Sequence, residues 1–248
     1  MRPKSRLWLL SAGLLAVGAA LIAAAVTVYW QPCAGSMLSG SVFNEFRYGP
    51  DFSDACLVAM DEAPVFPMLQ PGAGWTLTGG LGWVALILLA TSWLVLLPTL
   101  RLGWPAALAL AAPSLLSIAL AVLTLVAAFA PAGWSVSMQN GLVVGIELAA
   151  LVAMVMVGIG GIVRTLPFMR YIIVLGASTA AGWIHQIFEY MVAISLSDAN
   201  WDSPPGTGYF TAMAIAASAL VTVLLWVFGR EPVDSRTTVP VLGQAGRS

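Results

Sequence analysis

The chain has 248 residues, of which 60% are hydrophobic and only 8% are charged, and its mean hydropathy is +0.92. This composition excludes a water-soluble globule, because soluble domains of ordinary composition carry about 25% charged residues. The formal net charge is -1, and the sequence has no basic patch, so nucleic acid is excluded as a partner. The sequence therefore predicts an integral membrane protein whose first partner is the lipid bilayer.

Six apolar runs are long enough to cross a membrane, because a hydrocarbon core about 30 Å thick needs roughly 20 apolar residues per helical crossing. They lie at 7–30, 79–100, 104–129, 141–163, 171–196 and 209–229. These runs are continuous, whereas the strands of a membrane barrel alternate apolar and polar residues. We therefore expect an all-α polytopic membrane protein with a six-helix transmembrane bundle.

The basic residues predict the orientation, because Lys and Arg are retained on the cytoplasmic side of short loops. With the N-terminus inside, Arg47 is the only basic residue outside. We expect residues 1–30 to form a cytoplasmic N-terminus and the first crossing, 31–78 an extracytoplasmic loop, 79–229 the other five crossings, and 230–248 a disordered cytoplasmic tail. Ala and Gly are abundant and Arg outnumbers Lys, which favours a bacterial source. We therefore expect a multi-pass protein of the bacterial cytoplasmic membrane, with both termini in the cytoplasm.

Both cysteines, Cys33 and Cys56, fall in the extracytoplasmic loop. Paired cysteines on the oxidising side of a membrane usually form a disulfide, so we predict a bridge between them, with two free thiols as the alternative. The pair lacks the Cys-x-x-Cys spacing of a redox enzyme, which indicates a structural role. Ser53 is placed to cap a short helix that carries Leu57 and Met60.

The fifth apolar run contains the stretch "GWIHQIFEYMVAIS" at 182–195, which holds His185, the single histidine of the chain, and Glu189. At about 100° per residue, one helix face would carry the polar or small residues of this run. They are Ser178, Gly182, His185 and Glu189, with Gln186 and Tyr190 flanking. Ionisable groups facing lipid cost several kcal/mol and are normally paired, so this face is expected to meet protein or trapped water.

Glu147 in the fourth run is the expected partner of this face. The short connection "RTLPFMR" makes the fourth and fifth crossings antiparallel neighbours. Counted from the ends of the two runs, Glu147 and Glu189 share a depth, and His185 lies one turn deeper. The sequence therefore predicts that Glu147, His185 and Glu189 meet in one pocket.

Three interpretations of this cluster stay open. The side chains can simply tie helices together through hydrogen bonds. They can form a proton or cation pathway, because intramembrane carboxylates and imidazoles are usual parts of such relays. They can also hold a divalent metal, with Glu147, His185 and Glu189 as its ligands. The sequence identifies no cofactor.

Small residues indicate where helices approach one another closely. Gly141-x-x-x-Gly145 lies in the fourth run and Ser178-x-x-x-Gly182 in the fifth. Such spacing lets two backbones pack together, so Gly141, Gly145 and Gly182 are expected at a contact between these helices or at a surface for another subunit.

Function is predicted mainly from what the chain lacks. There is no Walker A motif, no His-Glu-x-x-His pair and no Gly-x-Ser-x-Gly elbow. We expect a non-enzymatic accessory, assembly or partner-binding subunit of a bacterial membrane complex, with the partner bound through the outer loop or a small-residue helix face. The alternative is a small transporter or proton or cation pathway through Glu147, His185 and Glu189. A membrane enzyme with a divalent metal site comes third.

Overall fold

All regular structure in the described residues is helical. The structure is a computed structural model, and it describes residues 3–36, 52–61, 76–100, 102–129, 136–164, 168–196 and 204–228. Its helices are α1 (Pro3–Tyr29), η1 (Gln31–Cys33), α2 (Asp54–Asp61), α3 (Leu77–Leu94), η4 (Leu97–Leu100), α4 (Trp104–Phe129), α5 (Val136–Arg164), α6 (Phe168–Ser178), α7 (Trp183–Leu196) and α8 (Tyr209–Phe228), where η marks a short 3₁₀ helix. The expected tail at 230–248 and most of the loop at 31–78 lie outside the described residues.

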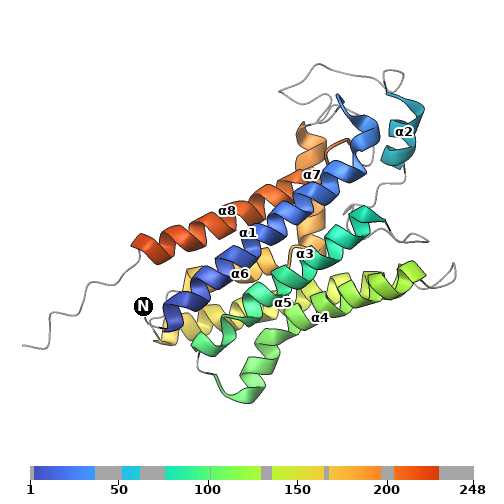
Figure 1. Ribbon diagram of the computed structural model, residues 1–248. Helices are drawn as coiled ribbons and strands as arrows, with labels where there is room; N and C mark the ends of the chain where they lie inside the picture. Colours follow the sequence, from blue (N-terminus) through green and yellow to red (C-terminus); the bar gives the residue numbers. More distant parts are fainter. Residues whose placement is uncertain are drawn as a thin grey trace, which may run out of the picture.

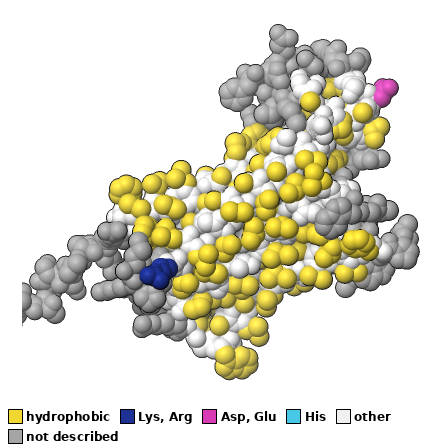
Figure 2. All heavy atoms as spheres, in the orientation of Figure 1, with side chains coloured by type: hydrophobic (Ala, Val, Ile, Leu, Met, Phe, Trp, Pro, Cys, Tyr) yellow, Lys and Arg dark blue, Asp and Glu magenta, His cyan; other side chains and the backbone are white. Residues whose placement is uncertain are grey.

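Five helical segments within these ranges are long and apolar enough to cross a membrane. They are Arg6–Tyr29, Leu77–Leu100, Trp104–Val126, Gly141–Gly160 and Tyr209–Phe228. Figure 2 shows one face of the molecule covered by apolar side chains, with charged side chains of the described residues only near its two ends. This surface is the one expected of a membrane protein, in which apolar side chains face the acyl chains.

The helices form a bundle around α6 (Figure 1). Helix α1 packs between α3 and α8, α4 packs on α3 and α5, and α6 contacts α1, α3, α5 and α8. Helix α7 contacts α5 and α8 and runs at a steep angle to α1 and α8. The short helix α6 is thus the interior element, and α7 is the one that departs from the common direction.

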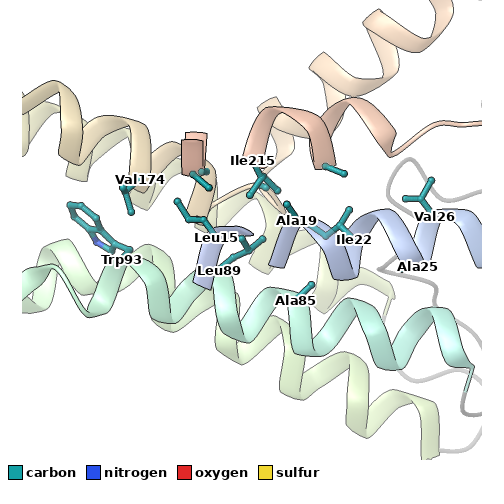
Figure 3. Close-up of a cluster of buried hydrophobic side chains, with 14 of the residues drawn as sticks. Leu15, Ala19, Ile22, Ala25, Val26, Ala85, Leu89, Trp93, Val174 and Ile215 are labelled. Carbon is teal, nitrogen blue, oxygen red and sulfur yellow. The ribbon is translucent and has the colours of Figure 1, made fainter. Parts of the chain in front are cut away.

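The main apolar core lies between α1, α3, α6 and α8 (Figure 3). Leu15 and Ile22 of α1 and Leu89 of α3 are fully buried in it. At Gly18 a Cβ atom would lie only 2.8 Å from the Leu89 Cδ2 atom, so α1 and α3 approach closely there. Packing of this kind holds helices together in lipid, where no hydrophobic driving force acts between them.

The prediction of a single continuous helix over 171–196 is wrong. The chain instead forms α6 and α7, separated by four residues at 179–182 that are not helical. The Thr179 side chain donates to the carbonyls of Leu175 and Gly176, and the Gly182 N–H donates to the Thr179 carbonyl at 2.8 Å. These bonds close a turn inside an apolar stretch whose composition alone favours a continuous helix.

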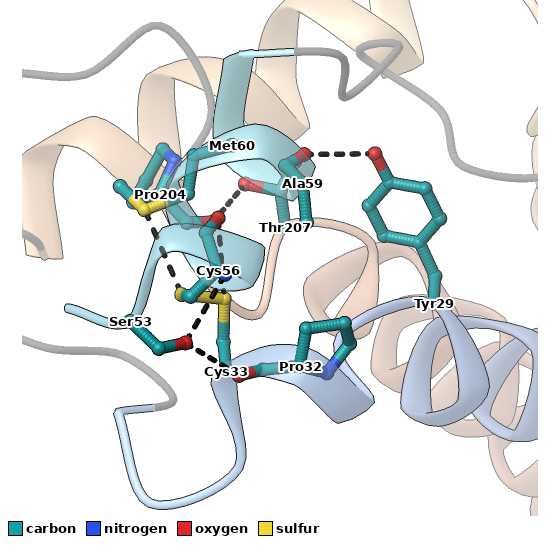
Figure 4. The surroundings of a disulfide bond; sticks show 9 residues. All are labelled: Tyr29, Pro32, Cys33, Ser53, Cys56, Ala59, Met60, Pro204 and Thr207. Atoms are coloured by element: carbon teal, nitrogen blue, oxygen red, sulfur yellow. Dashed lines mark hydrogen bonds between the residues drawn. A yellow bond between two sulfur atoms is a disulfide. The ribbon is translucent and has the colours of Figure 1, made fainter.

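The expected disulfide between Cys33 and Cys56 is present, and it fastens α2 to η1 at the end of α1 (Figure 4). The Cys56 N–H donates to the Ser53 Oγ at 3.2 Å, which confirms the predicted helix cap. Figure 4 also places Pro204 and Thr207 beside the disulfide. We call α2, η1 and the buried turn at 204–208 the cap.

Two further hydrogen bonds join the cap to α1. The Tyr29 hydroxyl donates to the Ala59 carbonyl of α2 at 2.8 Å. The fully buried Trp30 donates its ring N–H to the Thr207 carbonyl at 2.9 Å. The cap is therefore held by one covalent and several polar contacts, all at the same end of the bundle.

Replacing both cysteines by serine should destabilise the protein by about 3 kcal/mol, the loop-closure value for a bridge of this length. The two cysteines are 23 residues apart in the sequence. The measurement is thermal unfolding in a mild detergent, with Ser53→Ala as a comparison that removes only the helix cap. An unchanged midpoint for the double serine variant would show that the bridge does not restrain the chain.

Candidate functional site

The candidate site lies at the break between α6 and α7, which is wholly buried. Ala177, Ser178, Thr179, Ala180 and Ala181 are all buried. Buried non-helical backbone is tolerated only where its N–H and carbonyl groups find partners within the protein or in trapped water. The break satisfies this condition by lying inside the bundle.

Glu147 of α5 reaches the first turn of α7. Its Oε2 atom accepts a hydrogen bond from the backbone N–H of Ile184 at 3.3 Å. The first N–H groups of any helix lack partners within the helix, and the helix dipole favours a negative charge at this end. Glu147 therefore caps α7 from a neighbouring helix.

Gly182 leaves the space that the Glu147 carboxylate occupies. A Cβ atom built on Gly182 would lie 2.2 Å from the Glu147 Oε2 atom, well inside contact distance. Gly182 was expected at a contact between helix backbones, and the close contact that it makes is with a carboxylate. Gly145 faces α4 instead, since its Cβ would lie 3.6 Å from Leu116, and Gly141 has open space beside it.

His185 lies beside Glu147. Its Nδ1 atom is 3.6 Å from the Glu147 Oε2 atom, which is the distance of an ion pair when the imidazole is protonated. The same Nδ1 atom is buried and has no hydrogen-bond partner. The His185 side chain is 31% exposed, so part of the ring reaches the surface of the bundle.

Glu189 forms its hydrogen bonds with α8. It is fully buried, and its carboxylate accepts from the N–H of Gly208 at 2.5 Å, the N–H of Thr211 at 2.6 Å and the hydroxyl of Thr211 at 2.9 Å. The φ angle is 109° at Gly208 and 101° at Gly206, a left-handed conformation that suits glycine. Glu189 thus caps α8, as Glu147 caps α7.

The structure brings together two of the three predicted cluster residues. Glu147 and His185 are neighbours, while both carboxylate oxygens of Glu189 are bonded to the start of α8. Across the residues that the structure describes, no group of three His, Cys, Asp or Glu side chains is placed to hold a metal ion. The geometry of the described part therefore favours the first interpretation, in which the carboxylates tie helices together.

Two of the polar residues predicted beside the cluster, Ser178 and Gln186, form hydrogen bonds at the break between α6 and α7. Ser178 donates its hydroxyl to the Leu175 carbonyl at 2.8 Å, and Gln186 donates its side-chain amide to the Ala181 carbonyl at 2.8 Å. Both bonds satisfy carbonyl groups near the end of α6 that a continuous helix would have used. Tyr190 is half-buried on α7.

Gly208 and Thr211 were not predicted as site residues. Their most visible signal is the stretch "PPGTG" at 204–208, a turn sequence directly before an apolar run, which marks a helix N-terminus. Nothing in that stretch indicates that the capping carboxylate comes from another helix.

A second candidate surface is an apolar groove of about 630 Å³ between α1 and α8. Most of its lining residues are alanines, which are Ala12, Ala16, Ala19, Ala20 and Ala23 on α1 and Ala212, Ala216 and Ala219 on α8. It extends along α1 from Leu9 to Ala23, about 21 Å at 1.5 Å per residue. The Tyr209 hydroxyl and the Thr27 Oγ1, 2.8 Å apart, lie near one end.

Comparison with known proteins gives no match to this chain among protein-family models, curated proteins or solved structures.

Replacing Gly182 by alanine should destabilise the protein by roughly 1–3 kcal/mol, because the added methyl group displaces the Glu147 carboxylate. Gly141→Ala is the matched control, since it adds the same group to α5 where there is open space. In a double-mutant cycle with Glu147→Ala, most of the cost of Gly182→Ala should disappear. Equal unfolding midpoints for the two alanine variants would contradict the close contact.

Replacing Glu189 by glutamine should cost about 2–4 kcal/mol, because the new NH₂ group faces backbone donors that the carboxylate had satisfied. Thr211→Val removes only the hydroxyl bond and should cost about 1 kcal/mol. Thermal unfolding of both variants in detergent shows which of them loses more stability. A glutamine variant no less stable than Thr211→Val would mean that Glu189 is not a helix cap.

Proposed function

We propose that this protein is a non-enzymatic accessory subunit of a bacterial membrane complex, and that it binds one transmembrane helix of a partner in the groove between α1 and α8. In this proposal α6 and α7 together make a sixth crossing, both termini are cytoplasmic, and the cap is extracytoplasmic. The observation that carries the proposal is the groove itself, an alanine-lined hollow on the side of a membrane bundle.

The length of the groove favours a helix over a lipid chain as its occupant. One leaflet of the hydrocarbon core is about 15 Å thick, half of the whole core. The groove extends over about 21 Å of α1, so it continues beyond a single leaflet. An acyl chain stays in its own leaflet, whereas a transmembrane helix crosses both and can lie along the entire groove.

The lining also suits a helix. Alanine side chains let another backbone approach closely, and packing of this kind drives helix association in lipid. At Gly13, one of the lining residues, a Cβ atom would meet nothing within 4 Å. A helix that presents larger apolar side chains would fill this space, whereas the same groove on a second copy of the chain would leave it open.

The carboxylates support a role without transport. Glu189 is fully buried and bonded to the start of α8, and Glu147 is 6% exposed and bonded to the start of α7. Groups engaged in this way hold helices in place, and a transport pathway needs groups that exchange partners.

A proton or cation pathway is the second candidate, and the observation that favours it is the unpartnered Nδ1 atom of His185 beside Glu147. It is tested by ion or proton flux in liposomes that contain the wild-type protein or Glu147→Gln. Flux that depends on Glu147 would support a pathway, and wild-type flux equal to that of empty vesicles would exclude it.

Replacing Ala20 by leucine should weaken partner binding roughly tenfold or more, because a filled groove excludes the helix. Ala24→Leu is the matched control, since Ala24 is also an exposed alanine of α1 but does not line the groove. A photoreactive residue at position 16 should cross-link to one membrane protein in native membranes, and the cross-link should be lost with Ala20→Leu and kept with Ala24→Leu. Cross-links only to lipid, or only between two copies, would contradict the proposal.

A further inference from the structure

Two hydroxyl groups form a polar end to the groove between α1 and α8. Tyr209 of α8 lines the groove, and its hydroxyl oxygen lies 2.8 Å from the Oγ1 atom of Thr27 on α1. The same Oγ1 atom donates to the Ala23 carbonyl oxygen at 2.7 Å. Among the described residues that line the groove, Tyr209 alone carries a hydroxyl, amide or charged group. The groove is therefore apolar along its length and polar at this end.

The two short distances determine where the hydroxyl protons lie. A threonine hydroxyl has one proton, and a carbonyl oxygen can only accept. The Thr27 proton therefore points to the Ala23 carbonyl, and the proton of Tyr209 completes the bond between the two hydroxyls. Thr27 is the side-chain partner of Tyr209 within the described part of the chain. The Tyr209 oxygen, which has given its proton to Thr27, keeps unused capacity to accept a hydrogen bond.

We propose that the partner helix in this groove carries a neutral side chain with an N–H donor, which donates to the Tyr209 oxygen. The proposal rests on the proposed function, because it describes the helix that the groove binds. A helix lying along the groove covers the polar end, and a covered acceptor without a donor lowers affinity. A donor on the partner removes this cost and fixes how the two helices align along the groove.

A side-chain N–H is the donor that fits this position. The backbone N–H groups of a membrane helix are bonded within the helix itself. Serine and threonine hydroxyls in helices can donate to the carbonyl four residues before, as Thr91 and Ser218 do in this chain. Lys and Arg are disfavoured on the extracytoplasmic side, where the proposed orientation places the start of α8. The neutral N–H donors that remain are those of Asn, Gln, Trp and His.

The position of Tyr209 also predicts where the donor lies on the partner. Tyr209 is the first residue of α8, and the lining on α8 continues to Val223, about 21 Å away at 1.5 Å per residue. The donor is therefore at one end of the contact, and roughly 14 residues of the partner helix separate it from the other end.

The test uses the full chain in native membranes, with a photoreactive residue at position 16 as the probe for the partner. Tyr209→Phe keeps the ring in the groove and removes the acceptor. It should weaken binding roughly three- to twentyfold, the range of one interhelical hydrogen bond in lipid, measured as cross-link yield at low expression. Thr27→Val is the matched comparison, since it breaks the same bond to Tyr209 and leaves the Tyr209 oxygen in place. Its yield should exceed that of Tyr209→Phe.

A second probe locates the donor on the partner. Met213 is exposed, lines the groove and lies one turn along α8 from Tyr209. A photoreactive residue at position 213 should cross-link to a partner segment that contains Asn, Gln, Trp or His within one turn of the attachment point, as mapped by mass spectrometry. Replacing that side chain by leucine should remove most of the effect of Tyr209→Phe, as in a double-mutant cycle.

Three results would overturn the donor while a cross-linked partner helix still supports the groove. They are equal yields from Tyr209→Phe and Thr27→Val, a mapped segment without such a side chain, and a higher yield from Thr27→Val than from the wild type. The last result would mean that the partner presents an acceptor, since Thr27→Val frees the Tyr209 proton. The absence of any cross-linked partner helix at position 16 would contradict the groove proposal, and the donor with it.

Discussion

A backbone N–H or carbonyl group that is buried without a partner costs several kcal/mol, and the arrangement of α5, α6, α7 and α8 follows from this constraint. Breaking a helix inside the bundle creates a new N-terminus with unpaired N–H groups. The chain meets this need at α7 with Glu147 and at α8 with Glu189. Each carboxylate comes from a different helix than the one it caps, so capping also fixes how the helices sit relative to one another.

The cap and the carboxylates form one connected set of contacts. The disulfide fastens α2 beside the turn at 204–208, and Trp30 bonds to Thr207 in that turn. The next residue, Gly208, donates to Glu189, which lies on α7. The end of the bundle that carries the cap is therefore joined to the broken helix through a single short turn. Gly208 has a φ of 109°, a left-handed conformation that glycine adopts more readily than other residues, so the turn favours glycine at this position.

The sequence predicted those features that depend on composition and local chemistry. Continuous apolar runs indicated the long helices, and Ser53 before an apolar turn indicated the start of α2. The proximity of Glu147 and His185 followed from the short connection between their two runs. The six-crossing topology and its orientation stay predictions.

The break in the fifth run could not be predicted, for a physical reason. Thr179 and Gly182 lie among residues that a membrane helix tolerates well, so periodicity and hydropathy continue through them. What stabilises the start of α7 after the break is a carboxylate supplied by a distant part of the chain, together with a glycine that leaves room for it. The partners of Glu189 were missed for the same reason, since backbone N–H groups have no signature in the sequence.

Amide hydrogen exchange measured by NMR on the protein in nanodiscs tests most directly the claim that buried carboxylates cap α7 and α8. With Glu189→Gln, the amides of Gly208 and Thr211 should exchange much faster than in the wild type, while amides in the middle of α8 keep their protection. With Glu147→Gln, the same selective loss should appear at Ile184. Unchanged exchange at these three amides would show that neither carboxylate is a cap and would contradict the proposed role of Glu147 and Glu189 at the broken helix.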